Sequence, residues 1–265
     1  MDLNLKGRRA LVTGSTGGIG YATARELARL GAAVAINGRT AKRVETAIVQ
    51  LKSEVPGAEF IAAAGDLGNA EGAASVIRAL SDADILVNNA GIFEPKPFFE
   101  IPDTDWLRFF EVNVLAGIRL ARHYTPLMVK RGWGRVVFIS SESGLHIPAE
   151  MVHYGMTKTA ELAVARGLAE TVTGTGVTVN SVLPGPTLSE GVATFMRQMA
   201  KGVANPDLDQ MGRDFIAAHR PSSLLGRLAS IEEVANMVAY VCSPASSATT
   251  GAALRVDGGV VRSIV

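Results

Sequence analysis

The sequence has one cysteine, few aromatic residues and no long apolar run. Cys242 has no second cysteine with which to form a disulfide or a zinc site, so we expect a small buried side chain. No apolar stretch reaches the roughly 20 residues of a transmembrane helix. The formal net charge is +1 without any run of like charges, which gives no attraction to nucleic acid or to an anionic membrane. A strand-like stretch begins near the N-terminus with no targeting segment before it, so a cytoplasmic protein is expected.

The apolar content is high enough for one large core, because 48% of the 265 residues are hydrophobic and only 19% are charged. Seven short stretches are mostly apolar on both faces, at residues 9–14, 33–37, 59–65, 84–91, 134–141, 177–185 and 252–259. Helix-like stretches lie between them, at 18–30, 40–54, 69–81, 103–130, 152–173 and 231–242. The alternation predicts a single α/β domain over residues 1–265, a Rossmann-type doubly wound sheet of seven parallel strands flanked by helices.

Residues 187–228 interrupt this rhythm, because they contain no strand pattern. Phe195, Met196 and Met199 follow one another there at roughly helical spacing. Two short helices that enlarge the core are one interpretation. We favour a small helical lid over the substrate, because ligands of such sheets bind beyond the carboxyl ends of the strands.

A glycine-rich loop, TGSTGGIG, follows the first expected strand and opens the first expected helix. Glycine allows the backbone to approach a pyrophosphate closely, and the N-terminus of the helix attracts its negative charge. This context predicts a dinucleotide site and not an empty turn. The loop residues expected to line it are Gly14, Ser15, Thr16, Gly18, Ile19 and Gly20.

The end of the second expected strand, Asn37–Gly38–Arg39–Thr40, has no acidic residue that could bond the ribose 2′-hydroxyl of NAD. Arg39 offers a guanidinium suited to a 2′-phosphate, and Thr40 follows it. We therefore expect NADP(H) as the preferred cofactor and NAD(H) as the alternative. An ordinary solvated arginine at a helix start is the competing interpretation of Arg39.

The next two strand ends offer further cofactor contacts. Asp66, followed by Leu67, can accept a hydrogen bond from the adenine amino group or cap a helix. The small residues of Asn89–Ala90–Gly91 leave space for the adenosine half of a dinucleotide, although a plain turn has the same composition.

Tyr154 and Lys158 stand four residues apart, so in a helix they share one face. Taken alone, they fit a surface tyrosine beside a solvated lysine. Together with other motifs, however, the chain resembles the short-chain dehydrogenase/reductase family, in a single-domain form like the 3-oxoacyl-carrier-protein reductases. The resemblance runs from about residue 5 to residue 260 and rests on TGSTGGIG, NNAG, Asn113 in EVNVLAGIRLAR, Ser141 thirteen residues before Tyr154, Pro184–Gly185 and VDGG.

The resemblance implies that a carbonyl and a secondary alcohol are interconverted by hydride transfer with a nicotinamide cofactor. Tyr154 would be the general acid and base. Lys158 would lower the pKa of this phenol and bind the ribose of the cofactor. Ser141 would bind the substrate oxygen, and Asn113 would hold a water that links Lys158 to solvent.

The resemblance also implies a nicotinamide contact after Pro184–Gly185. Here the sequence departs from the family, because Pro186–Thr187–Leu188–Ser189 follows. We expect the backbone contact at Thr187 and the usual threonine role at Ser189.

The substrate is less well defined by the sequence. Ser143, His146 and His153 flank Ser141 and Tyr154, and Phe195, Met196 and Met199 suit an adaptable, partly apolar pocket for a small carbonyl or alcohol substrate. No metal site is expected.

Several functions are open on this fold. A 3-oxoacyl-carrier-protein reductase would use basic residues such as Lys130 and Arg131 for docking, although Thr175 replaces a second basic residue common in that branch. A nicotinamide-nucleotide sensor would not need the four proton-transfer residues, and an epimerase of extended form would need a longer C-terminal part. The resemblance further implies a homo-oligomer, a dimer of dimers (homotetramer), through the helices of Asn113 and Tyr154.

Overall fold

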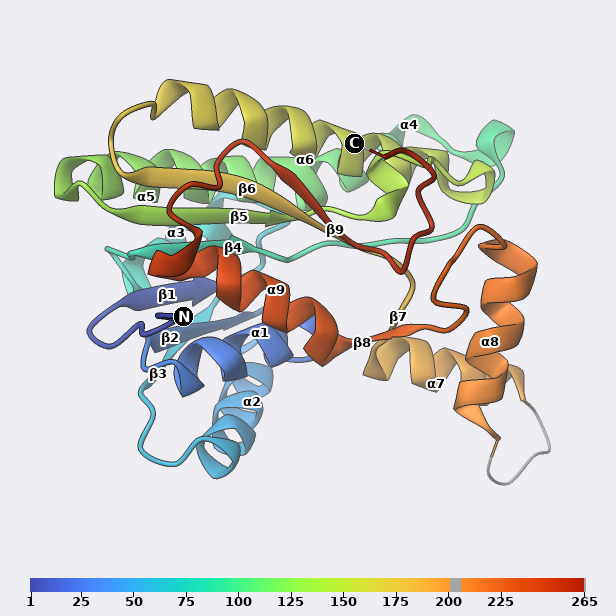
Figure 1. Cartoon of the computed structure of the whole chain (residues 1–265), viewed down its shortest axis with the longest axis horizontal. Helices are drawn as coiled ribbons and strands as arrows, with labels where there is room; N and C mark the ends of the chain where they lie inside the picture. Colours follow the sequence, from blue (N-terminus) through green and yellow to red (C-terminus); the bar gives the residue numbers. More distant parts are fainter. Residues whose placement is uncertain (201–205, 265) are drawn as a thin grey trace.

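The computed structural model describes residues 1–200 and 206–264, apart from the side chains of Phe195, Gln198 and Met199. A seven-stranded sheet lies at its centre, in the order β3-β2-β1-β4-β5-β6-β9 with every pairing parallel (Figure 1). The predicted doubly wound sheet is therefore confirmed. Its strands are β1 (Arg9–Val12), β2 (Ala33–Gly38), β3 (Phe60–Ala64), β4 (Ile85–Asn88), β5 (Gly134–Ile139), β6 (Val177–Pro184) and β9 (Ala253–Val256).

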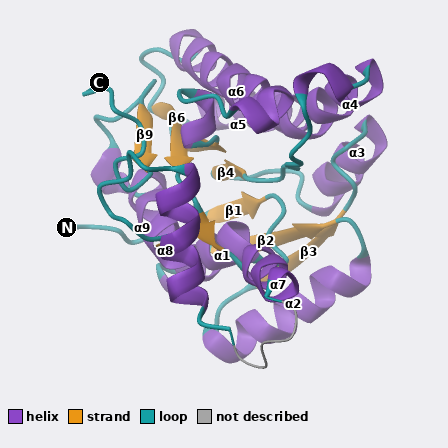
Figure 2. Cartoon of the chain, turned by 90° about the vertical axis from the view of Figure 1, so that its right-hand side faces the viewer, coloured by secondary structure: helices purple, strands orange, loops and turns teal. Residues whose placement is uncertain are grey.

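Helices cover both faces of this sheet, as Figures 1 and 2 show. On one face lie α1 (Gly18–Arg29), α2 (Ala41–Glu54) and α9 (Ile231–Cys242), and on the other lie α3 (Ala70–Ala79), α5 (Ala116–Arg131) and α6 (Val152–Thr171). Alternate strand residues point to the two faces, so Val12 packs under α1 and α9 whereas Leu11 packs under α3 and α5. All eight residues of β6 are buried, which explains why the central strands are apolar throughout.

The helix expected over residues 103–130 is present in the structure and contains a π-helical turn. It consists of α4 (Asp103–Phe109), a π-helical turn over Phe110–Leu115, and α5, which ends at Gly132 in a left-handed conformation with φ of 74°. Residues 103–131 are helical throughout, so the expected helix is confirmed, and the π turn within it is the feature that the apolar spacing did not predict. Asn113 lies in this turn.

The segment between β6 and α9 also differs from expectation. Thr187–Leu188 (β7) pairs in parallel with Ala229–Ser230 (β8), so this region does contain strands, each too short to show an alternating pattern. Between them, α7 (Glu190–Met199) and α8 (Leu208–His219) stand beyond the carboxyl ends of the main strands (Figure 1). They bury a small apolar cluster of their own, formed by Met196, Ile216 and Leu228. We refer to residues 187–230 as the helical lid.

Across the described part of the chain, none of the helices has the length and apolar character needed to span a bilayer.

Candidate active site

The glycine loop after β1 is held in shape by its own neighbours. Gly14 and Gly18 adopt φ of 60° and 58°, which side-chain-bearing residues rarely adopt. The amide side chain of Asn37 accepts from the Gly14 N–H at 3.1 Å, and Asn89 donates to the Gly14 carbonyl at 3.2 Å. A Cβ atom on Gly20 would lie 2.4 Å from Nδ2 of Asn89, so the loop closes only around glycine. The loop therefore has a fixed shape.

The N-terminus of α1 is suited to an anionic ligand. Within the described residues no side chain caps it, whereas Thr40 caps α2 and Asn69 caps α3. The first N–H groups of α1 therefore have no side-chain acceptor at the helix start, and a phosphate bound there would satisfy them. The loop residues thus fit the pyrophosphate of a dinucleotide.

At the end of β2, Asn37 has a structural role and Arg39 is available to a ligand. Asn37 is buried and serves the fold, because its Nδ2 donates to the carbonyls of Ala63 and Gly65. Arg39 is exposed and forms no hydrogen bond or ion pair within the part of the chain that the structure describes, so its guanidinium is available. A side chain on Gly38 would press on Thr16, with an ideal Cβ 2.5 Å from its methyl group.

The candidate adenine contacts at the end of β3 behave differently from one another. Asp66 is exposed and accepts from the Gly68 N–H at 3.0 Å. The helix-capping alternative for Asp66 is wrong, because Asn69 caps α3. The side chain of Leu67 packs in the core between the sheet and α3, so only its backbone faces the sheet edge.

Gly91, after the end of β4, lies next to two of the catalytic candidates, Asn113 and Lys158. A Cβ atom there would lie 3.4 Å from Oδ1 of Asn113 and 3.6 Å from Nζ of Lys158. Asn113 bonds both backbone groups of Ile92, at 2.8 and 3.0 Å, and donates to Thr157 at 2.9 Å. Its amide is committed to these partners, and the water-holding role implied by resemblance has no direct support from these bonds.

Tyr154 and Lys158 lie one turn apart on α6, with Nζ of Lys158 5.7 Å from the centre of the tyrosine ring. The structure therefore brings together the pair that the spacing suggested. Phe93 packs edge-on against the same ring, with centroids 6.3 Å apart. Lys158 is buried, and its Nζ donates to the carbonyl of Ile139 at 2.9 Å and to both carboxylate oxygens of Glu161.

Ser141 follows β5 at the same sheet edge. Its Oγ accepts from the Ser143 N–H at 3.1 Å and donates to Oε2 of Glu142 at 2.5 Å. Glu142 is buried as well, and its other oxygen accepts from Arg220 of the lid. The serine hydroxyl is thus anchored through an ion pair.

The surroundings of Tyr154 set its acidity. Burial raises the pKa of the phenol, while the charge of Lys158 and the Ser141 hydroxyl act to lower it. Glu142 and Glu161 both raise this pKa, and the net pKa is above that of a free tyrosine. Lys158 acts in the expected direction, but its effect is outweighed in this structure.

The start of the lid lies against the glycine loop. Thr187 donates to the Gly185 carbonyl at 2.8 Å, and Ser189 caps α7 by accepting from the Val192 N–H. A Cβ atom on Gly18 would lie 3.7 Å from Cβ of Ser189. Pro184, Gly185, Thr187 and Ser189 therefore lie on the path from β6 to the glycine loop.

The candidate substrate residues are not all at the site. Ser143 is buried beside Ser141, and the side chain of His146 is exposed after it. His153 packs between Phe109 and Trp106, with ring centroids 4.1 and 5.9 Å away, and its side chain is fully buried. Burial lowers the pKa of His153, so this histidine is a packed, neutral side chain facing α4.

The methionine and phenylalanine candidates of the lid divide in the same way. Met196 is 5% exposed inside the apolar cluster of the lid, so it supports the lid and does not face a substrate. The side chains of Phe195 and Met199 lie outside the described residues.

Two charged residues of this site were not expected from the sequence. Glu161 carries no signal beyond its place three residues after Lys158, and Arg220 lies in a region without a motif. Both are buried. Glu161 is paired with Lys158, and Arg220 is paired with Glu142, the residue after Ser141. Among the described residues, no group of three His, Cys, Asp or Glu side chains could hold a metal ion.

Comparison with known proteins identifies the family. Residues 8–200 match the model of the short chain dehydrogenase family. The chain belongs to this family. It is 50% identical to the uncharacterized oxidoreductase YvaG of Bacillus subtilis (strain 168), over the full length of both chains. It is 32% identical to the 3-oxoacyl-[acyl-carrier-protein] reductase FabG of Aquifex aeolicus (strain VF5), with 98% of this chain and all of the relative covered.

A solved structure extends the comparison to three dimensions. L-sorbose reductase from Gluconobacter frateurii, complexed with NADPH and L-sorbose, superposes with a TM-score of 0.92 and 30% identity over the whole of both chains. The protein is accordingly an oxidoreductase that acts on a carbonyl or alcohol with a nicotinamide cofactor.

Proposed function

We propose that this short-chain dehydrogenase/reductase is an NADP(H)-dependent enzyme that interconverts a small carbonyl compound and its secondary alcohol, with Tyr154 as general acid and base. The observation that carries the proposal is the convergence of Ser141, Tyr154 and Lys158 at the carboxyl edge of the sheet, where Gly91 adjoins Lys158. Ligands of doubly wound sheets bind at this edge.

Tyr154 handles the proton in this proposal. In reduction its hydroxyl donates to the substrate oxygen, and in oxidation its phenolate accepts the proton from the alcohol. Lys158 stabilises the phenolate by its charge. The Ser141 hydroxyl keeps a second lone pair that can accept from an alcohol, and by turning away from Glu142 it can donate to a carbonyl and stabilise negative charge on that oxygen. When bound, the nicotinamide supplies or accepts the hydride.

Arg39 supports NADP(H) over NAD(H). It is exposed at the end of β2, and among the described residues its guanidinium has no other partner, so it is available to a 2′-phosphate. Acidic residues that would select NAD are absent from the Asn37–Thr40 strand end. The presence of NADPH in the Gluconobacter frateurii reductase agrees with this assignment.

A free small molecule fits the site better than a carrier protein. Arg131, a candidate for docking an acidic carrier, bonds both Asp82 oxygens at 3.0 and 2.9 Å and lies 3.1 Å from Asp84. Its charge is therefore already neutralised. L-Sorbose, the ligand of the Gluconobacter frateurii reductase, makes sugars and polyols the first compounds to test.

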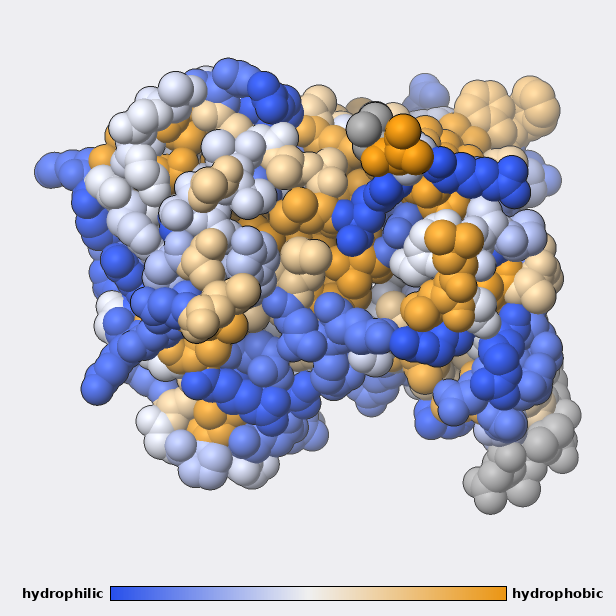
Figure 3. Space-filling view, viewed as in Figure 1, coloured by the Kyte–Doolittle hydropathy of each residue, from blue (hydrophilic) through white to orange (hydrophobic). Residues whose placement is uncertain are grey.

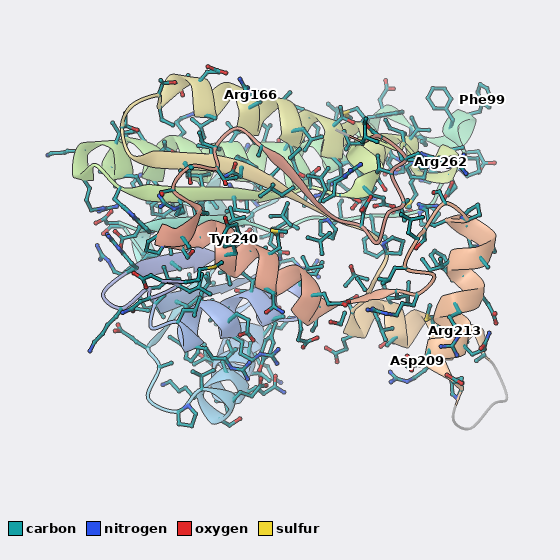
Figure 4. The ribbon with its side chains drawn as sticks, in the orientation of Figure 1. Phe99, Arg166, Asp209, Arg213, Tyr240 and Arg262 are labelled. Atoms are coloured by element: carbon teal, nitrogen blue, oxygen red, sulfur yellow. The ribbon has the colours of Figure 1, made fainter. Side chains whose placement is uncertain are left out.

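The surface around α4 supports a homo-oligomer, with a dimer of dimers as the proposed form. Phe99 is 99% exposed and Leu107 is 69% exposed. Figure 3 shows hydrophobic atoms projecting at the upper right of the molecule, where Figure 4 labels Phe99. An exposed apolar patch of this kind favours self-association. A monomer mass at micromolar concentration by light scattering would contradict this assignment.

The function is tested by turnover with a matched pair of tyrosine variants. NADPH absorbance is followed with sugars, ketones, 3-oxoacyl thioesters and steroids as substrates. Tyr154→Phe is expected to remove nearly all turnover and to leave NADPH binding intact. Tyr240→Phe, on α9 and away from the site in Figure 4, is the control and should keep full activity. Substantial turnover by Tyr154→Phe would show that another group moves the proton.

A further inference from the structure

Glu161 is a buried carboxylate at the centre of the candidate site. It follows Lys158 by three residues on α6, so both side chains lie on the face turned toward β5. The residue is only 2% exposed. A carboxylate in such a place is costly unless a positive group pairs with it, and within the described residues its partner is Lys158.

The pairing uses all the hydrogen-bonding capacity of Lys158. An ammonium group has three N–H donors. In the structure, Nζ has three acceptors: the Ile139 carbonyl at 2.9 Å, Oε2 of Glu161 at 3.0 Å and Oε1 at 3.2 Å. Glu161 therefore holds the ammonium at the end of β5, and a cofactor ribose that bonds Lys158 must take over one of these contacts.

The pairing also changes the charge that Tyr154 faces. Without Glu161, the nearest charge on α6 would be a single ammonium. Once Glu161 is ionised, Lys158 and Glu161 together carry no net charge. From the β5 side, Glu142 faces the same phenol, and its charge is balanced by Arg220. The influence of Glu161 on the pKa of Tyr154 is to raise it, in the same direction as Glu142.

We propose that Glu161 is a positioning residue, which fixes Lys158 at the end of β5 and keeps Tyr154 protonated by offsetting the charge of that lysine. This inference rests on the proposed function and deepens it. A phenol that remains protonated at neutral pH is ready to donate, so Glu161 extends to higher pH the range in which Tyr154 acts as the acid.

The decisive experiment measures the ionisation of Tyr154 in the cofactor-free protein. Tyrosinate absorbance is titrated with pH in the wild type and in Glu161→Gln, each compared with the same protein carrying Tyr154→Phe. The difference isolates Tyr154 from the other three tyrosines. Glu161→Gln is expected to lower the midpoint of this ionisation by about one pH unit or more, because an anion is removed beside the phenol. An unchanged or higher midpoint overturns the proposal.

Two further variants separate charge from packing. Glu161→Leu fills a similar space without charge and must shift the Tyr154 midpoint in the same direction. It provides the same test if Glu161→Gln does not fold. Glu170→Gln removes an exposed carboxylate from the same helix and should leave the midpoint unchanged.

Kinetics then distinguish this inference from the proposed function. The pH profile of alcohol oxidation should move to lower pH in Glu161→Gln, in parallel with the titration. If turnover depends on Tyr154 but the pH profile of Glu161→Gln matches that of the wild type, the role of Glu161 is contradicted and the proposed function is not. A shifted titration in a protein without turnover on any substrate contradicts the proposed function and leaves the charge role of Glu161 standing.

Discussion

Nε of Arg220, at the end of α8, lies 3.1 Å from Oε1 of Glu142, the residue that follows Ser141. Both side chains are less than a tenth exposed. The same guanidinium reaches Glu150 at 3.4 Å. One lid residue is thus tied to the loop that carries the serine hydroxyl, so the position of the lid and the orientation of Ser141 are coupled.

Arg220→Met is expected to destabilise the protein by about 3–5 kcal/mol, because it leaves the Glu142 carboxylate buried without its partner. Unfolding in urea, followed by circular dichroism, measures this loss. Arg213→Met is the matched control on α8, since Arg213 is exposed and, among the described residues, bonds only Gln210, and Figure 4 shows it at the surface. The double variant Glu142→Gln/Arg220→Met should recover part of the loss. A loss below about 1 kcal/mol for Arg220→Met, the range of exposed pairs, would contradict the buried pairing.

Gly20→Ala is expected to weaken NADPH binding by at least about tenfold, or 1.4 kcal/mol. The added Cβ would lie 2.4 Å from Asn89 and 2.5 Å from the Gly14 carbonyl, so the glycine loop must shift. Fluorescence titration with NADPH measures the dissociation constant. Gly167→Ala on α6 is the control, because a Cβ atom there would have no neighbour within 4 Å among the described residues, and this variant should bind NADPH like the wild type. Equal binding by both variants would show that this loop does not hold the cofactor.

Arg39→Ala tests the choice between the two nicotinamide cofactors. Loss of a charge-assisted bond to the 2′-phosphate is worth about 1.5–3 kcal/mol, so NADPH should bind roughly 10- to 100-fold more weakly. NADH lacks this phosphate, and its dissociation constant should not change. Lys52→Ala, at the far end of α2, controls for a general loss of positive charge. If NADH binds the wild type as tightly as NADPH, the role of Arg39 is wrong.

The strands and the glycine loop could be predicted because they depend on local pattern. Apolar runs such as β6 are buried on both faces, and glycines such as Gly14 mark places where the backbone has a positive φ that other residues rarely adopt. The orientation of His153 could not be predicted in this way. It precedes Tyr154 by one residue, and the roughly 100° turn between helical neighbours points it at Phe109.

Glu161 shows a second limit of sequence reasoning. In an alanine-rich helix, a glutamate is normally a solvated residue, and only the structure reveals that Glu161 is buried and paired with Lys158. Arg220 is hidden for the same reason, because its partner Glu142 lies 78 residues away along the chain. Long-range pairs of this kind leave no local pattern.

The burial of Glu161 makes the stability of the protein depend on pH. Burial raises the pKa of this carboxyl from 4.5 to about 7, although Lys158 acts to lower it. The native protein therefore holds this proton more tightly than the unfolded chain, and the free energy of unfolding should fall as pH rises from about 4.5 through about 7. Glu161→Gln cannot titrate, so its stability relative to the wild type should rise by about 3 kcal/mol across that window. Urea unfolding at pH 5 and pH 8 measures the difference, with Glu170→Gln as the exposed control on the same helix. A constant difference between Glu161→Gln and wild type at both pH values would show that Glu161 stays ionised throughout.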